Sequence, residues 1–182
     1  MPTLKLAALS LILMAGVAVA ATPQSPGLGR PATPTEVQAV DISVPPDGST
    51  LPPGSGSVAQ GAAVFEANCQ MCHGPAGVGG PNDRLTGGVG TLTSPKPIKT
   101  VNSFWPYATT VYDYVRRAMP LVAPQSLSNN DVYAVVAYLL SVDGVAPKDA
   151  VLDAKTLPLV KMPNRDGFVS WEARYRPKTA AR

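Results

Sequence analysis

The sequence is poor in the residues that build metal clusters, since its 182 residues include only two cysteines and one histidine. A structural zinc site needs four such ligands, and no second Cys or His pair exists. Basic blocks are also missing, because Arg116-Arg117 is only a local pair. Beyond the N-terminus, no apolar run is long enough to span a bilayer. These absences exclude zinc proteins, nucleic-acid binding proteins and proteins with several membrane spans.

The first 20 residues have the pattern of a secretory signal peptide. Lys5 supplies the positive charge, residues 6–17 are almost all apolar, and Ala18-Val19-Ala20 is a small-x-small cleavage site. The apolar run is shorter than the roughly 18–20 residues of a spanning helix. We therefore predict cleavage before Ala21, a periplasmic protein and no stable membrane insertion afterwards. The alternative is an uncleaved membrane anchor.

The remaining chain divides into three segments by its proline content. Residues 21–56 contain many prolines, which fix φ and remove backbone donors, so we predict an extended linker. Within it, residues 37–44 could dock as a short strand. Residues 57–144 carry helical periodicity and form the predicted folded domain. Residues 145–182 have weak periodicity and predict an irregular C-terminal tail that packs on this domain or on a partner.

Three helices are predicted in the domain, which makes it all-α. They cover residues 58–69, 109–119 and 128–144. Ser57 and Gln60 form a capping box before the first, Pro120 stops the second, and Ser128 with Asp131 caps the third. Glycine and proline fill residues 74–107, which we interpret as a long loop. Since a core of about 90 residues is small, a bound cofactor would have to complete it.

The two cysteines and the histidine fall together in Cys69-Gln-Met-Cys72-His73, a C-x-x-C-H motif typical of c-type haem attachment. Two thiols one turn apart can each bond a vinyl group on the same porphyrin edge, and His73 can then bind the iron. A thioredoxin-type pair needs a βαβ setting, which the pattern lacks. A disulfide stays possible but leaves the histidine unexplained. We predict one covalent haem c, held by Cys69, Cys72 and His73.

The second axial ligand of the iron is less tightly specified. Met71 lies between the cysteines and cannot reach the far face of the ring. Met119, at a helix end before a proline, is the preferred ligand, and Met162, in a similar Met-Pro pair, is the runner-up. An empty distal position is the third option.

Other candidates surround the predicted haem. The second ring nitrogen of His73 needs a partner, usually a backbone carbonyl, and we expect that of Pro81 in preference to Pro75. Three further side chains lie where the loop should pass the haem and could bind its propionates or simply pack. They are Arg84, Trp105 and Tyr107.

The order of helix, C-x-x-C-H, long loop, helix, methionine and capped helix resembles class I cytochrome c over about residues 57–144. That fold implies three main helices around one haem, with the first and last crossing closely. Gly61 and Phe65 match the expected contact surface on the first helix, and Tyr138 and Leu139 match it on the last.

A narrower resemblance is to the haem subunits of bacterial sulfite or sulfane dehydrogenases, which pair with a molybdenum subunit. It rests on residues 79–85, 105–120 and 161–168. The resemblance implies that Met119 is the axial methionine and that the tail motif is structural. It also implies a redox partner with a molybdopterin cofactor. Some of these cytochromes carry two haems, whereas this chain has one attachment motif.

The predicted function is single-electron transfer, and we expect no enzymatic activity of the chain by itself. Two alternatives stay open: a general periplasmic electron carrier for another dehydrogenase, and a haem-based enzyme or sensor with an open distal site.

Overall fold

The computed structural model describes residues 28–172. The predicted signal peptide, the start of the linker and residues 173–182 therefore lie outside the described residues. The chain divides into two units, residues 1–39 and 40–182. No helix among the described residues has the length and apolarity needed to cross a membrane.

The described part of the first unit leads into helix α1, Pro34–Val40. Thr33 and Glu36 cap it reciprocally, since the Thr33 amide donates to the Glu36 carboxylate at 2.8 Å and the Glu36 amide donates to Thr33 Oγ1 at 3.3 Å. Arg30 pairs with Glu36, and these contacts lower the pKa of Glu36 to about 2. The predicted strand over residues 37–44 was therefore wrong: residues 37–40 belong to α1, which the cap and Pro34 favour, and residues 41–44 form no strand.

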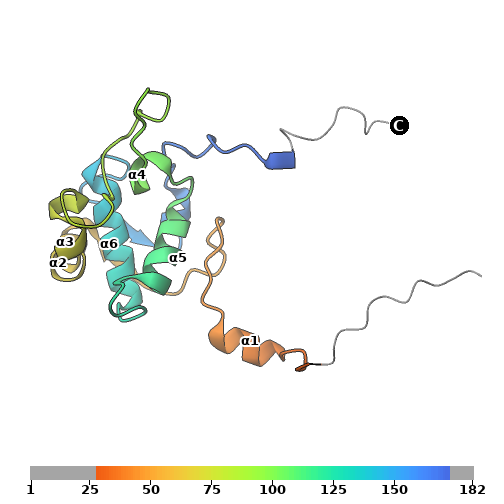
Figure 1. The fold of residues 1–182 in the computed structure, drawn as a ribbon. Coiled ribbons are helices and arrows are strands. Elements are labelled where there is room, and N and C mark those ends of the chain that lie inside the picture. Colours follow the sequence, from red (N-terminus) through yellow and green to blue (C-terminus); the bar gives the residue numbers. More distant parts are fainter. Residues whose placement is uncertain (1–27, 173–182) are drawn as a thin grey trace, which may run out of the picture. The chain divides into compact units, whose positions relative to one another are not determined.

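The second unit contains the three predicted helices, here α2, α5 and α6, and it confirms the all-α class I fold (Figure 1). Shorter elements join them. The bounds are β1 Ser55–Ser57, α2 Val58–Asn68, α3 Gln70–His73, η1 Pro75–Gly77, α4 Val101–Phe104, α5 Ala108–Ala118, α6 Asn129–Val142, β2 Val151–Asp153 and η2 Leu157–Leu159. The two capping boxes predicted at Ser57 and Ser128 are both present.

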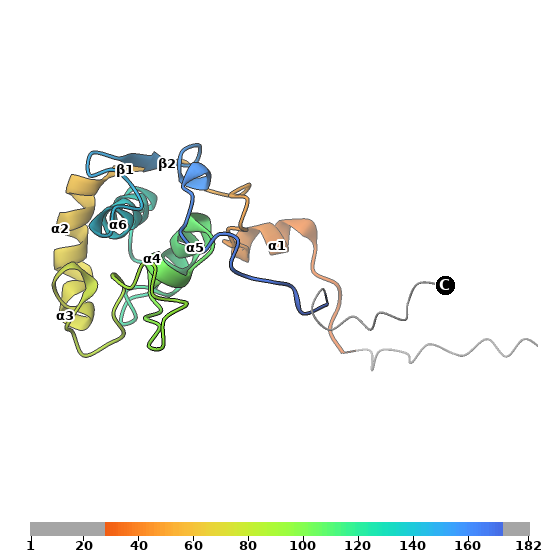
Figure 2. The ribbon, with the colours of Figure 1, turned by 90° about the horizontal axis from the view of Figure 1, so that it is seen from above.

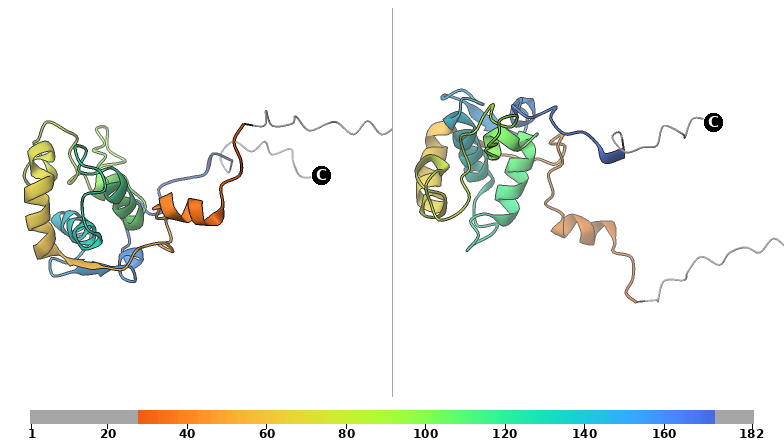
Figure 3. Two further views of the ribbon diagram at one scale, coloured as in Figure 1. Left: turned by 90° about the horizontal axis from the view of Figure 1, so that it is seen from below. Right: turned by 45° about the horizontal axis from the view of Figure 1, so that its top comes forward.

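Helix α6 is the centre of the domain and lies between α2 and α5 (Figure 3). A Cβ on Gly61 of α2 would fall 1.8 Å from the Ala134 carbonyl oxygen of α6, so the two backbones touch. Beside this point the rings of Phe65 and Tyr138 pack with centroids 5.3 Å apart. The predicted crossing is confirmed, and its closest residue on α6 is Ala134, which the sequence pattern had not singled out.

Residues 42–57 do not form a free linker but lie against α5 and α6. The Val44 amide donates to the Asp113 carboxylate at 2.7 Å, and Tyr133 Oη donates to the Pro52 carbonyl at 2.8 Å. The segment ends in β1, which pairs antiparallel with β2 beside α6 (Figure 2). Side chains of the helices therefore provide hydrogen-bond partners for this proline-rich backbone, which forms few hydrogen bonds within the segment itself. We call residues 42–57 the belt.

Asp113 is a buried attachment of the belt on α5, and its carboxylate also pairs with Arg117. We expect Asp113→Ala to lower the free energy of unfolding by about 2 kcal/mol, since it leaves the buried Val44 amide without an acceptor. Urea denaturation measures this. The exposed Asp149→Ala is the control and should stay within about 0.5 kcal/mol of the parent; equal stability of both variants would contradict the attachment.

The tail also belongs to the domain over its described part. Leu152, Leu157 and Met162 are buried within the main hydrophobic core, with Met162 only 1% exposed. The predicted boundary at residue 144 therefore marks the end of α6, after which Gly144 takes a positive φ, but not the end of the packed unit. An irregular chain can fill a core when a few large apolar side chains anchor it.

Candidate functional site

The C-x-x-C-H residues form one helical turn at the end of α2. Cys69 caps α2, and its carbonyl accepts the amides of Cys72 at 3.1 Å and His73 at 3.0 Å. Both cysteines are half-buried free thiols, so the alternative of a disulfide between them is not what the structure shows. Met71, between them, is 82% exposed. One turn thus presents two thiols and an imidazole together.

Burial acts on the first thiol. It raises the pKa of Cys69 to about 11, with a smaller contribution from Cys72. Catalytic dithiols of the thioredoxin type need the opposite, a pKa lowered toward neutrality so that a thiolate can attack. The site therefore does not have the electrostatics of a disulfide oxidoreductase.

The imidazole of His73 is fixed by a backbone carbonyl, as predicted, but from a different residue. Nδ1 of His73 lies 2.7 Å from the Asp83 carbonyl oxygen, so the predictions of Pro81 and Pro75 were wrong. The reason is the shape of the loop. The chain turns back where a Cβ on Gly80 would meet the Cys72 carbonyl, and Asn82 then donates to that same carbonyl at 2.9 Å. After this turn, the carbonyl that lies against the imidazole of His73 is that of Asp83.

The loop between residues 74 and 107 is more ordered than predicted. It contains η1 and the four-residue helix α4, whose Thr100 and Ser103 form a capping box. The Val101 amide donates to the Leu85 carbonyl at 3.1 Å, which ties α4 to the segment that holds His73. The Thr-x-x-Ser spacing was a signal for this helix, although a capping box usually has Glu or Gln at its last position.

The two candidate methionines lie in different surroundings. Met119 ends α5 and is half-buried at the edge of the core, whereas Met162 is inside the core. A methionine enclosed by apolar side chains already has the packing role usual for this residue. The difference in burial therefore favours Met119 over Met162 as the candidate axial ligand.

Two of the three possible propionate ligands have aromatic or cationic neighbours. Trp105 packs edge-on against Tyr114 at 5.7 Å between centroids, and the Arg165 guanidinium lies 4.2 Å from the Tyr107 ring centroid. Arg84 is exposed. Sequence reasoning missed Tyr114 and Arg165, since neither their spacing nor their type links them to residues 105–107.

The comparisons with known proteins agree with this arrangement. A family model described as cytochrome C oxidase, cbb3-type, subunit III matches residues 56–139. A chain in the crystal structure of the sulfane dehydrogenase SoxCD from Paracoccus pantotrophus is 44% identical, with a TM-score of 0.75. The match covers 85% of this chain and 76% of that chain. The chain is a class I c-type cytochrome. No curated protein sequence matches it.

The site of this cytochrome fits the haem c that its family binds. The two thiols are free and lie one turn apart, as two bonds to one porphyrin edge require. The Asp83 carbonyl engages Nδ1 of His73 and leaves Nε2 for the iron. Among the described residues, no group of three or more His, Cys, Asp or Glu side chains could hold a separate metal ion.

Proposed function

We propose that this cytochrome carries one haem c, bonded to Cys69 and Cys72, and transfers single electrons. His73 and Met119 are its axial ligands. The observation that carries the proposal is the Cys69–His73 turn with the ring of His73 held by Asp83, because it presents the thiols and Nε2 as a set. The bound haem supplies the one-electron Fe(III)/Fe(II) couple, and methionine ligation raises its potential. With both axial positions filled, substrate has no open site, so the chain by itself is not an enzyme.

The electron donor we propose is a molybdenum-containing sulfite or sulfane dehydrogenase subunit, in the periplasm after removal of residues 1–20. What supports this donor is the 44% identity to a chain of a sulfane dehydrogenase. A general carrier for another dehydrogenase is the second candidate, favoured only by the shared haem-attachment turn. Copurification decides between them: a molybdopterin-containing subunit retained by the tagged cytochrome supports the first, and its absence under low salt contradicts it.

Exposed apolar side chains lie next to both sets of proposed haem ligands. Met71 lies between the two cysteines, and Leu121 and Val122 follow Met119, with Val122 87% exposed. Apolar surface left in water is a feature of protein docking sites. A donor that docks over these residues would approach the haem edge, and small, transient contacts are typical of redox partners.

The distal ligand is tested by comparing two methionine variants. Met119→Ala should abolish the absorption band of methionine sulfur bound to ferric iron and lower the reduction potential, since the sulfur that favours ferrous iron is lost. Met162→Ala should keep the band but lower the free energy of unfolding by about 2–5 kcal/mol, because it empties a core position. If Met162→Ala lost the band and Met119→Ala kept it, Met162 would be the iron ligand and the assignment of Met119 would be wrong.

A further inference from the structure

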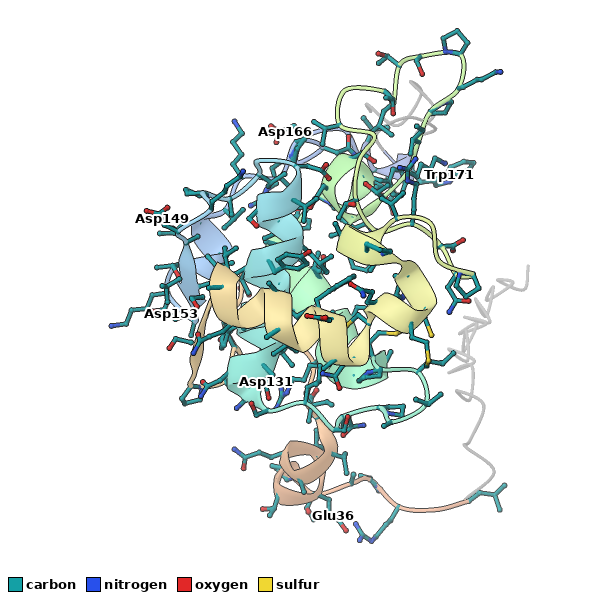
Figure 4. The ribbon with its side chains drawn as sticks, turned by 90° about the vertical axis from the view of Figure 1, so that its left-hand side faces the viewer. Glu36, Asp131, Asp149, Asp153, Asp166 and Trp171 are labelled. Atoms are coloured by element: carbon teal, nitrogen blue, oxygen red, sulfur yellow. The ribbon has the colours of Figure 1, made fainter. Side chains whose placement is uncertain are left out.

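The tail returns to the domain at residues 162–168, which we call the tail brace. Asn164 Nδ2 donates to the Phe104 carbonyl, at the end of α4, at 2.7 Å. The ring of Phe168 packs edge-on against that of Phe104 at 5.2 Å, and Met162 anchors the brace in the core. Figure 4 shows the turn through Asp166 beside the α4 ribbon. The brace thus holds the C-terminal end of α4.

The other end of α4 is joined to the segment that holds the histidine. The Val101 amide donates to the Leu85 carbonyl at 3.1 Å, and Thr100 Oγ1 donates to the Gly87 carbonyl at 2.7 Å. Leu85 is two residues after Asp83, whose carbonyl lies 2.7 Å from His73 Nδ1. A continuous series of short contacts therefore runs from the tail brace through α4 to the imidazole.

Helix α4 cannot set its own position. It has four residues, far below the roughly 12–15 that an isolated helix needs in water. The Phe104 carbonyl is also one of the groups at a helix end that lack a partner within the helix. Contacts with the rest of the domain therefore determine where α4 lies. Its middle is held on α6, where the buried Asn102 donates to the Leu139 carbonyl at 2.8 Å and to the Asp143 carboxylate at 2.7 Å. Its two ends are held by the tail brace and by the segment that contains Leu85.

We propose that the tail brace positions the Asp83 carbonyl against His73 through α4, and so adjusts the reduction potential of the haem. This inference rests on the proposed ligation of haem iron by His73. A histidine that donates Nδ1–H to a carbonyl is a more basic ligand. A more basic ligand stabilises ferric iron and lowers the potential. Loosening the brace weakens this hydrogen bond and raises the potential.

Two variants loosen the brace by different routes. Asn164→Ala removes the amide that binds Phe104. Gly167→Ala keeps the amide but displaces it, because a Cβ on Gly167 would lie 1.8 Å from Asn164 Oδ1, the end of a movable side chain. Asn129→Ala is the matched control, since Asn129 Nδ2 also donates to a backbone carbonyl, that of Pro53, at 3.3 Å but away from α4.

The experiment measures the reduction potential and the exchange rate of His73 Nδ1–H by NMR in the reduced, haem-loaded proteins. Both brace variants should favour reduction by three- to tenfold, the upper value being 59 mV for one electron, with faster exchange. Asn129→Ala should match the parent. Unchanged potential and exchange in both brace variants would overturn the inference even if their Tm falls. A parent protein without haem would instead overturn the proposed function.

Discussion

Replacing both Cys69 and Cys72 with alanine is expected to give a protein from which all haem is removed by denaturation. The two half-buried thiols are the cysteines of the whole sequence, so no other residue can form a thioether bond. Histidine ligation alone leaves the cofactor free to dissociate when the chain unfolds. The measurement is in-gel haem staining after denaturing electrophoresis of protein exported with the maturation machinery present.

Met71→Ala is the matched control for the cysteine variant. Met71 lies in the same turn but is 82% exposed, so its loss should leave staining at the parent level. The single variants Cys69→Ala and Cys72→Ala should each keep one bond and stain in reduced yield. Full staining of the double variant would contradict attachment through this turn.

The second large effect concerns the fold. Gly61→Val should lower the free energy of unfolding by about 3 kcal/mol or more, because its side chain would have to occupy the position of the Ala134 carbonyl and push α2 away from α6. Such a loss is a large share of the roughly 5–15 kcal/mol that stabilises a domain. Thermal and urea unfolding of the haem-loaded protein measure it.

The control for Gly61→Val lies on the same helix. Ala63 is exposed on α2, so Ala63→Leu adds apolar atoms without a clash and should change stability by less than about 0.5 kcal/mol. Near-equal stability of Gly61→Val and Ala63→Leu would mean that α2 and α6 do not cross at Gly61.

The sequence predicts those features that depend on neighbouring residues. A C-x-x-C-H turn closes through its own backbone, so the relation of Cys69, Cys72 and His73 follows from their spacing. The capped ends at Ser57 and Ser128 are local for the same reason. The Gly61 contact with α6 is long-range, and it was predicted only because the resemblance to class I cytochrome c implies a close crossing of the first and last helices.

Most other features that depend on distant partners were not predicted. The belt carries few apolar residues, and polar side chains of the helices attach it, among them the carboxylate of Asp113, which lies 69 positions beyond Val44 in the sequence. The carbonyl bound to His73 depends on where the loop turns back around Gly80, and no residue type marks a carbonyl for that role. Packing of the tail on this domain or on a partner was predicted, but the residues that anchor it were not, because Leu152, Leu157 and Met162 are isolated apolar residues without periodicity.

The central claim is that one haem is bonded to this chain, and intact-mass spectrometry of the purified, exported protein tests it most directly. We predict a mass equal to the chain that begins at Ala21 plus one haem, and after tryptic digestion a haem-bearing peptide that contains Cys69 to His73. A mass equal to the polypeptide alone, with both cysteines still reactive toward a thiol reagent after correct maturation, would contradict the account.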